Sequence, residues 1–311
     1  MGKKRIQTTA SAEATRLAED KDLGVSYGPG PDGNKFDILM QEETDGVVAA
    51  ERISRILKKR GVCLCEANAP PELLSQAFDE AEVLWKAGEF GPPMQVFDSD
   101  SQFEAQLWQQ VLYQDEQKVL WMSDEASSSK RRMEALKLLS QNMLEFSRGL
   151  GDILAQETGI NFSHSWNAML SCYTGNRSYA LHIDNPHKSG GPMELPDNGL
   201  RVTLVYYINP HWDPDSGDNG GGLDVFLTDP NSAPPSASTA RKAPKLRIAP
   251  HADTLAIFLA ERMAHQVVET MGKERMYCLT MWCFDQFALS NFVPQVSQKQ
   301  RDMQAGSDDD I

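Results

Sequence analysis

Two histidines and one aspartate have the residue types and spacing that suit a metal ion. His182 and Asp184 stand two residues apart in the segment SYALHID, and His265 follows later in the chain. Residues two apart on a strand point to the same face, so His182 and Asp184 can reach one ion. Two imidazoles and one carboxylate are a donor set that holds non-haem Fe(II) and leaves other coordination positions open. The pattern predicts an iron site, with a strand histidine paired to a surface carboxylate as the alternative.

Arg275 follows His265 in an otherwise apolar segment. An arginine inside a barrel is costly to bury unless it meets an anion, and a guanidinium binds a carboxylate through two parallel hydrogen bonds. We therefore expect a dicarboxylate co-substrate whose 2-oxo-acid end chelates the iron while its far carboxylate reaches Arg275. The alternative is a surface ion pair between Arg275 and Glu269 or Glu274.

Strands must position these side chains. From about Ser165 the chain consists of short β-branched and aromatic runs separated by turn residues, at 165–173, 178–184, 201–209, 222–227, 245–249, 254–260, 265–270 and 276–284. Seven or eight such strands without an intervening helix pattern favour an antiparallel barrel or sandwich.

Helices dominate the earlier half. Asp45 is a plausible N-cap for a helix that Gly61 ends, and a short strand follows to Glu66. Pro70 and Pro71 open a second helix, and a third begins after the serines at 127–129.

The predicted organisation has three parts. Residues 1–44 form a flexible arm, 45–285 a single catalytic domain, and 286–311 a polar tail. Within the domain, 45–164 is mainly helical support and 165–285 is the strand core.

Composition excludes several classes of protein. The 311 residues include 30 basic and 44 acidic side chains, and the net charge of −14 repels phosphate backbones and anionic membrane surfaces. We expect no nucleic-acid partner and no membrane span. The five cysteines form no Cys-x-x-Cys pair, which favours reduced thiols in a reducing compartment, so we expect a cytoplasmic protein, with the nucleus as a second location.

Several phrases in one order resemble a known family. AMLSCYTGNRSYALHIDNP, RVTLVYYINPHWD, NGGGLDVF, DTLAIFLAERMAHQV and LTMWCFD are similar to the 2-oxoglutarate- and Fe(II)-dependent prolyl 4-hydroxylases, most closely the hypoxia-inducible-factor type. The resemblance runs from about Gly61 to Asp285. It implies an α+β fold, a double-stranded β-helix (a jelly-roll or cupin-like barrel) with N-terminal helices packed on one face.

The resemblance also implies roles for individual residues. It makes His182, Asp184 and His265 the catalytic iron ligands and Arg275 the partner of the distal carboxylate of 2-oxoglutarate. The further positions are Tyr207, which supports that carboxylate, Tyr173 in the co-substrate pocket, and Tyr179 and Trp282 at the mouth and wall where the target proline lies. Before the resemblance is counted, each of these aromatic residues is more often plain core.

Two features depart from the family pattern. Arg275 stands seven steps before Trp282 where the family has six, so either a bulge absorbs one residue or Met276 occupies the usual position. The loops at 187–199 and 229–244 are also longer than in the family, and they border the expected site.

The implied reaction is that of a peptidyl-proline 4-dioxygenase. It uses Fe(II), with 2-oxoglutarate and O2 as co-substrates and ascorbate as reductant, on a protein or peptide that contains proline, and it can serve oxygen sensing in a hypoxia response. A carboxylate at Asp184 leaves no free position for chloride, which argues against a halogenase. The alternatives are a 2-oxoglutarate oxygenase for another side chain or a small molecule, and a non-catalytic metal-binding barrel.

Overall fold

The structure is a computed structural model that describes residues 34–43, 45–91, 118–122, 133–165, 167–187, 196–212 and 220–291. Most of the predicted arm (1–44), most of the tail (286–311) and the centre of the loop at 187–199 lie outside these residues. Residues 286–291 of the predicted tail are helical.

The described elements follow the predicted order of helices and then strands. The helices are η2 (Met40–Glu42), α2 (Gly46–Arg60), α3 (Pro71–Lys86), α5 (Glu134–Thr158) and α6 (Ala237–Ala240). The early strands are β1 (Ile38–Leu39), β2 (Val62–Glu66), β3 (Lys118–Trp121) and β4 (His164–Ser165). The later strands are β5 (Met169–Tyr173), β6 (Tyr179–His182), β7 (Leu200–Tyr207), β8 (Leu223–Phe226), β9 (Lys245–Ile248), β10 (Thr254–Leu259), β11 (His265–Val267) and β12 (Met276–Phe284).

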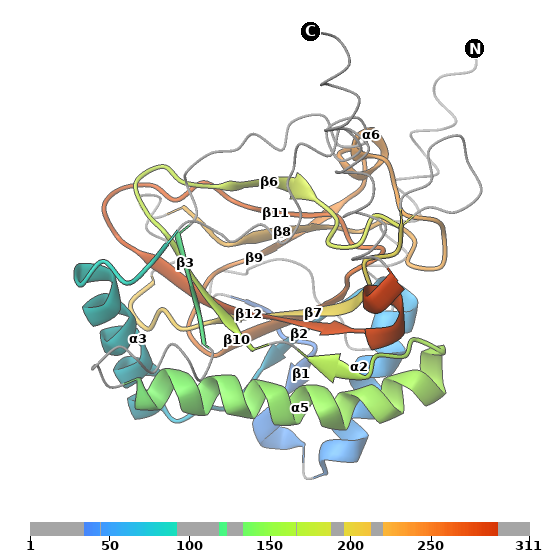
Figure 1. The fold of residues 1–311 in the computed structure, drawn as a ribbon, viewed down its shortest axis with the longest axis horizontal. Coiled ribbons are helices and arrows are strands. Elements are labelled where there is room, and N and C mark those ends of the chain that lie inside the picture. The colour runs from blue at the N-terminus through green and yellow to red at the C-terminus, as the bar shows by residue number, and fades with distance from the viewer. Residues whose placement is uncertain are drawn as a thin grey trace, which may run out of the picture.

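The described strands form two facing sheets. The larger, eight-stranded sheet has the order β1-β2-β10-β7-β12-β5-β3, with β4 paired to β12, and the smaller sheet has the order β6-β11-β8-β9. Pairing is antiparallel except between β1 and β2. Figure 1 shows the small sheet above the large one, with α2, α3 and α5 below the large sheet. The predicted α+β class, with helices on one face of an antiparallel barrel, is confirmed.

Local sequence explains where the helices begin and end. The Asp45 carboxylate accepts a hydrogen bond from the Val47 amide at the start of α2, and Gly61 ends the helix in a left-handed conformation with φ 81°. A Cβ at Gly61 would lie 2.2 Å from the Met263 sulfur, so glycine is needed for packing as well. Pro71 opens α3, because the first turn of a helix needs no amide hydrogen there.

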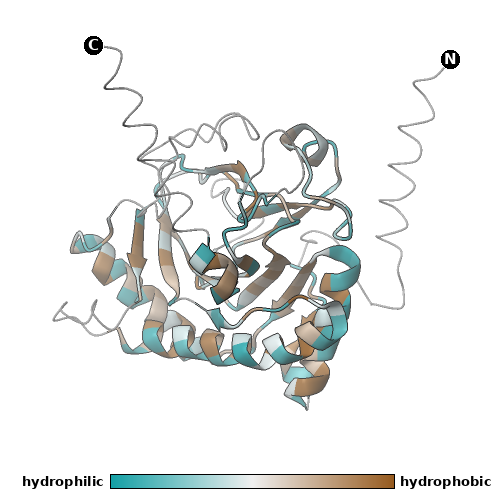
Figure 2. Cartoon of the chain, turned by 45° about the vertical axis from the view of Figure 1, so that its right-hand side comes forward, coloured by the Kyte–Doolittle hydropathy of each residue, from teal (hydrophilic) through white to brown (hydrophobic). Residues whose placement is uncertain are grey.

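The helices bury apolar stripes against the outer face of the large sheet. In Figure 2 the strands are mostly hydrophobic, whereas the helices alternate between hydrophobic and hydrophilic residues. The main core joins Ile53 and Leu57 of α2 and Leu136 of α5 to Leu170 and Leu279 of the sheet. None of the described helices is long and apolar enough to cross a membrane.

The register of β12 decides which side chains face the small sheet. Cys278 pairs with Tyr207 of β7 and Thr280 pairs with Val205, while on the other side Met276 pairs with Tyr173 of β5. Successive strand residues point to opposite faces. The even-numbered residues of β12 therefore share the inner face, and the odd-numbered ones face the helices.

Candidate metal centre

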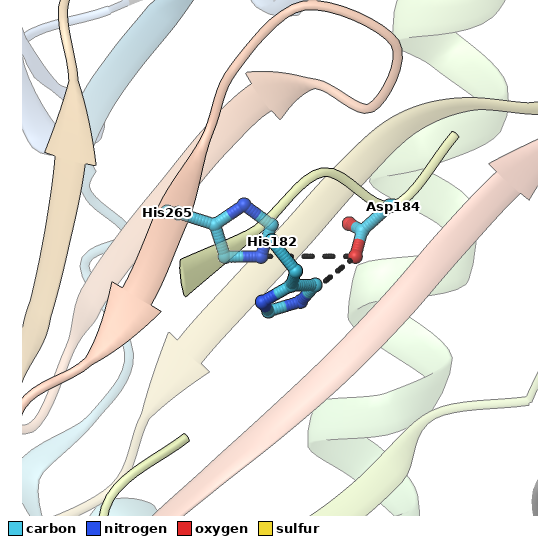
Figure 3. Close-up of side chains that lie close together, drawn as sticks. All are labelled: His182, Asp184 and His265. Atoms are coloured by element: carbon cyan, nitrogen blue, oxygen red, sulfur yellow. Dashed lines mark ion pairs between the residues drawn. The ribbon is translucent and has the colours of Figure 1, made fainter. Parts of the chain in front are cut away.

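Two neighbouring strands of the small sheet bring the predicted ligands together. His182 ends β6 and pairs directly with His265, the first residue of β11, so that the centroids of the two rings lie 4.1 Å apart. Asp184 follows two residues after His182 and turns toward both rings (Figure 3). The third ligand thus comes from the strand folded back beside the first two, as the sequence predicts.

The three side chains converge on one point. His182 Nε2 lies 3.3 Å from Asp184 Oδ1, and His265 Nε2 lies 3.7 Å from the same oxygen. One ligand atom from each of the three residues can be chosen so that all lie within 4.8 Å of one another, which is the spacing expected around a single ion. The donor set and its geometry fit Fe(II) bound on one side, with the remaining positions open.

The backbone fixes which nitrogen of each histidine faces the metal position. His182 Nδ1 lies 2.8 Å from the Ala180 carbonyl oxygen, and His265 Nδ1 lies 3.0 Å from the Met263 carbonyl oxygen. A carbonyl oxygen accepts a hydrogen bond but cannot donate one, so each Nδ1 carries the proton. The lone pair is then on Nε2 in both rings, the state that a metal ligand requires.

Asp184 is oriented by two side chains of the large sheet. The Thr203 hydroxyl of β7 donates a hydrogen bond to Oδ2, and Trp282 Nε1 of β12 donates to the same oxygen at 3.3 Å. Oδ1 faces the histidines. Oδ1 is therefore available to bind the ion, and the hydrogen bonds to Oδ2 hold the side chain in place.

The protonation states also suit metal binding. Burial opposes ionisation of Asp184, but the nearby imidazoles of His265 and His182 and the hydrogen bond from Thr203 hold its pKa well below its usual range. Burial, with His182 beside it, lowers the pKa of His265 to about 4. At neutral pH the site therefore offers an ionised carboxylate and a neutral imidazole, as a metal requires.

Aromatic rings surround the mouth of the site. The Tyr179 ring meets His182 edge-on at 4.7 Å between centroids, and the Trp282 ring lies 6.0 Å from Trp121 of β3. On the inner side, the Phe258 ring of β10 lies 4.5 Å from the His265 ring. The structure places Tyr179 and Trp282 beside the metal ligands, where the predicted target residue would lie.

Tyr173 and Tyr207 lie deeper, on the inner face of the large sheet. Their side chains are 3% and 1% exposed, and both belong to the row of inward-facing residues set by the register with β12. Burial raises the pKa of both hydroxyls well above the usual value, so both stay protonated and can donate a hydrogen bond. Both side chains therefore lie in the barrel interior, and their contact with a co-substrate stays a prediction.

Arg275 requires a correction. Its guanidinium donates from Nε and Nη2 to the two carboxylate oxygens of Glu82 on α3, on the helix side of the large sheet. The partner is neither Glu269 nor Glu274. The expected bulge does not occur between Met276 and Trp282, because β12 pairs in unbroken register over those residues. An odd number of steps then puts Arg275 and Trp282 on opposite faces, and Met276 takes the inward position.

Sequence reasoning missed Thr203, Phe258 and Trp121. Thr203 stands four residues before Tyr207 in β7, so the two-residue alternation that places Tyr207 inside also places Thr203 there. Phe258 and Trp121 carried no comparable signal, because their contacts depend on which strands become neighbours.

Comparisons with known proteins agree with this site. Residues 168–284, which contain all three candidate ligands, match the family described as the 2OG-Fe(II) oxygenase superfamily. The match covers the strand core, and together with the His-Asp-His cluster it implies Fe(II) and 2-oxoglutarate.

Solved structures share the fold at low sequence identity. A prolyl hydroxylase from Trichoplax adhaerens, in complex with a fragment of the hypoxia-inducible-factor oxygen degradation domain, is 21% identical over 80% of this chain and 96% of its own, with a TM-score of 0.56. A Pseudomonas putida prolyl-4-hydroxylase is 16% identical over 76% and 99%, with a TM-score of 0.51. The epimerase SnoN from nogalamycin biosynthesis is 12% identical over 76% and 83%, with a TM-score of 0.50. These likenesses confirm the double-stranded β-helix, and they span more than one reaction.

Proposed function

We propose that the protein is an Fe(II)- and 2-oxoglutarate-dependent dioxygenase that hydroxylates a prolyl residue of a protein or peptide. The observation that carries the proposal is the arrangement of His182, Asp184 and His265, each held by a further hydrogen bond with its ligand atom turned inward. The prolyl target is supported by the resemblance of the motifs and by the two prolyl hydroxylases that share the fold.

The protein's own residues orient and enclose the reaction. The two histidines and Asp184 would hold the ion and would leave other coordination positions for co-substrate and oxygen. When bound, Fe(II) supplies the oxidation of a C–H bond by O2, coupled to decarboxylation of a 2-oxo acid. Asp184 fills the position that a halide would need, so hydroxylation is favoured over halogenation.

Tyr179 and Trp282 are the proposed walls for the target residue. Tyr179 lies over the His182 ring, and Trp282 is held beside Asp184 by its indole hydrogen bond. A proline ring is compact and apolar, and flat aromatic walls can hold it against one side of the ion without a polar partner. The acidic overall charge, −14, favours a basic or neutral segment around the proline.

Hydroxylation of peptides tests the proposal. The purified protein, loaded anaerobically with Fe(II), is given 2-oxoglutarate, ascorbate and a library of proline-containing peptides in air, and mass spectrometry detects the gain of one oxygen. His182→Ala should abolish the product. His164→Ala is the matched control, because His164 is exposed and lies at the start of the domain core, away from the triad. Iron binding without hydroxylation of any such peptide would contradict the proposed prolyl substrate.

A second candidate keeps the cofactors and changes the substrate to another side chain or a small molecule. It is favoured by the shared fold of SnoN, an epimerase that depends on alpha-ketoglutarate. Incubation of the enzyme with a cell extract separates the two candidates, since mass spectrometry would then find the added oxygen on a residue other than proline or on a small metabolite. Iron binding with no oxygen-dependent consumption of 2-oxoglutarate would instead favour a non-catalytic metal-binding barrel.

Oxygen sensing is a further proposal that follows from the resemblance to the hypoxia-inducible-factor type. It requires a KM for O2 above the oxygen concentration of the cell, so that the rate follows oxygen supply. Steady-state rates over a range of dissolved oxygen measure this directly. A KM far below cellular oxygen would rule the role out, with the hydroxylase itself unaffected.

A further inference from the structure

The inward face of β12 carries no cation at the end away from Trp282. Met276, Cys278 and Trp282 share that face, and the Trp282 indole reaches Asp184. Arg275 and Tyr277 lie on the other face, where both bond the Glu82 carboxylate. The one arginine that the sequence offers in this segment is therefore turned toward α3.

Arg275 is firmly engaged where it lies. Glu82 accepts both of its guanidinium hydrogen bonds, together with one from the Tyr277 hydroxyl at 3.0 Å and an ion pair with Lys86 at 3.3 Å. The hydrogen bond from Arg275 lowers the pKa of Glu82, and Glu82 in turn raises the pKa of Arg275. To face inward, the arginine would have to leave this carboxylate and pass through the strand.

A shift of β12 by one residue would turn Arg275 inward only by disrupting the metal site. Such a shift moves every side chain to the opposite face. It would remove Trp282 from Asp184 and put Leu279 and Met281, which now pack in the core, against the metal site. The observed register is therefore the one that keeps the iron site intact.

Met276 fills the place that a cation would need. Its side chain is fully buried, and its sulfur accepts a hydrogen bond at 3.2 Å from the amide of Gly222, the residue before β8. A Cβ on the neighbouring Gly221 would lie 2.8 Å from this sulfur, so the methionine is closely enclosed. Tyr173 pairs with Met276, and Tyr207 pairs with the adjacent inward residue Cys278.

Tyr173 and Tyr207 place two hydroxyls on the same inner face as Met276. Within the described part of the chain, neither the Tyr173 nor the Tyr207 hydroxyl has a hydrogen-bond partner. Burial is the main cause of the raised pKa of Tyr173, and Cys278, Tyr179 and Tyr207 raise it further. Buried hydroxyls without a partner are expected to bond a polar group that comes within reach.

We propose that the far end of the 2-oxo-acid co-substrate is held by the hydroxyls of Tyr173 and Tyr207 against Met276, without a guanidinium, so that the site also accepts 2-oxo acids with an uncharged tail. The inference rests on the proposed iron- and 2-oxo-acid-dependent function. Two phenols can donate two hydrogen bonds to a carboxylate, but they do not neutralise its charge. A buried carboxylate without a counter-ion loses much of its hydration, whereas an apolar tail gains from contact with a methionine.

The test compares two co-substrates of similar shape. One is 2-oxoglutarate and the other is 5-methyl-2-oxohexanoate, in which an isopropyl group replaces the distal carboxylate. Each is titrated into the Fe(II)-loaded protein without oxygen, and binding is followed by the visible absorption band that a 2-oxo acid gives when it chelates Fe(II). We expect the two dissociation constants to agree within about tenfold. A preference for 2-oxoglutarate of about a hundredfold or more would overturn the proposal.

Substitutions at Met276 and Arg275 sharpen the test. Met276→Arg places a guanidinium beside Tyr173 and Tyr207. It should lower the dissociation constant of 2-oxoglutarate by about tenfold or more and raise that of the isopropyl analogue. Met276→Leu, which conserves volume, should leave the ratio of the two constants unchanged. Arg275→Gln combined with Glu82→Gln keeps a hydrogen-bonded pair on the outer face and should also leave the ratio unchanged, whereas a loss of 2-oxoglutarate binding would show that Arg275 turns inward.

Two further variants complete the assignment. Tyr207→Phe should weaken 2-oxoglutarate more than the isopropyl analogue, because only the carboxylate uses the hydroxyl. Arg177→Gln tests a second arginine, whose amide and carbonyl bond Thr270 beside Gly221. A selective loss of 2-oxoglutarate binding in Arg177→Gln would overturn the proposal. Because the titration needs neither oxygen nor peptide, its result stands even if no prolyl substrate is found.

Discussion

Thr203 donates its hydroxyl hydrogen to Oδ2 of Asp184, while the imidazoles of the site lie against Oδ1. Thr203 lies in β7 of the large sheet and Asp184 follows β6 of the small sheet, so this bond ties the metal centre to the large sheet. It also leaves the carboxylate a single orientation, together with the weaker bond from Trp282.

Thr203→Val should therefore weaken metal binding without removing a ligand. The isosteric change deletes the hydrogen bond, and loss of such a supporting contact typically costs roughly tenfold to a hundredfold in metal affinity. Competition with a chelator for Fe(II) or Mn(II) measures the change. Thr280→Val is the matched control, since Thr280 is a buried threonine of β12 without a bond to Asp184, and equal affinities for the two variants would contradict the assignment.

Metal should stabilise the folded protein through the triad alone. A ligand that binds only the folded state at about a hundred times its dissociation constant adds about 2.7 kcal/mol to the free energy of unfolding. Mn(II) should raise the melting temperature of the wild type by several degrees, and this rise should vanish in Asp184→Ala and in His265→Ala. Retention of the rise in either variant would place the ion elsewhere, and His164→Ala should behave as the wild type.

Glu82→Gln should destabilise the fold and leave the metal affinity unchanged. The substitution removes the negative charge that accepts hydrogen bonds from Arg275 and Tyr277. The Glu82 side chain is only 14% exposed. Hydrogen bonds to charged groups contribute about 1.5 to 3 kcal/mol, so a loss of that size in the free energy of unfolding is expected. Urea denaturation measures it, with the exposed Glu145→Gln on α5 as control.

A double-mutant cycle with Arg275→Gln separates the pair from its surroundings. The free energy of unfolding should fall less in the double variant than the sum of its decreases in the two single variants, because each single change already removes the interaction. Additive losses would show that the two side chains do not interact in solution.

Asp197 should make stability depend on pH in the acid range. Its carboxylate bonds Arg201 and Asn185, and although burial opposes ionisation, these contacts lower its pKa from the usual 3.8 to about 2. A folded-state pKa below the unfolded value stabilises the protein above about pH 4, and the stabilisation is lost as the pH falls toward 2.

Asp197→Asn should remove this dependence. The free energy of unfolding of the variant should be lower than that of the wild type by about 1 to 2 kcal/mol at neutral pH, and almost equal to it near pH 2. This size allows for the partial exposure of the carboxylate. Thermal unfolding between these pH values gives the curve, and parallel curves for variant and wild type would contradict the assignment.

Much of the fold followed from local pattern. The N-cap Asp45, the C-terminal Gly61 and the apolar period between them predicted α2 to within a residue, and alternation of β-branched residues predicted the strands of both sheets from β5 to β12. The short strands β1 and β3 were not predicted, because edge strands of two to four residues depend on the neighbour that pairs with them.

The sequence alone indicated which residues form the metal centre and which residues of β12 share a face. The two-residue repeat of a strand predicted that His182 and Asp184 reach one ion, although β6 ends at His182 and Asp184 lies two residues beyond it. The seven steps from Arg275 to Trp282 already put these two residues on opposite faces of any regular strand. Whether a bulge intervened was decided only by tertiary structure, where pairing with both β5 and β7 holds β12 in register. The partner of Arg275 was decided there too, because Glu82 lies far away in the chain and meets the arginine only when α3 packs on the sheet.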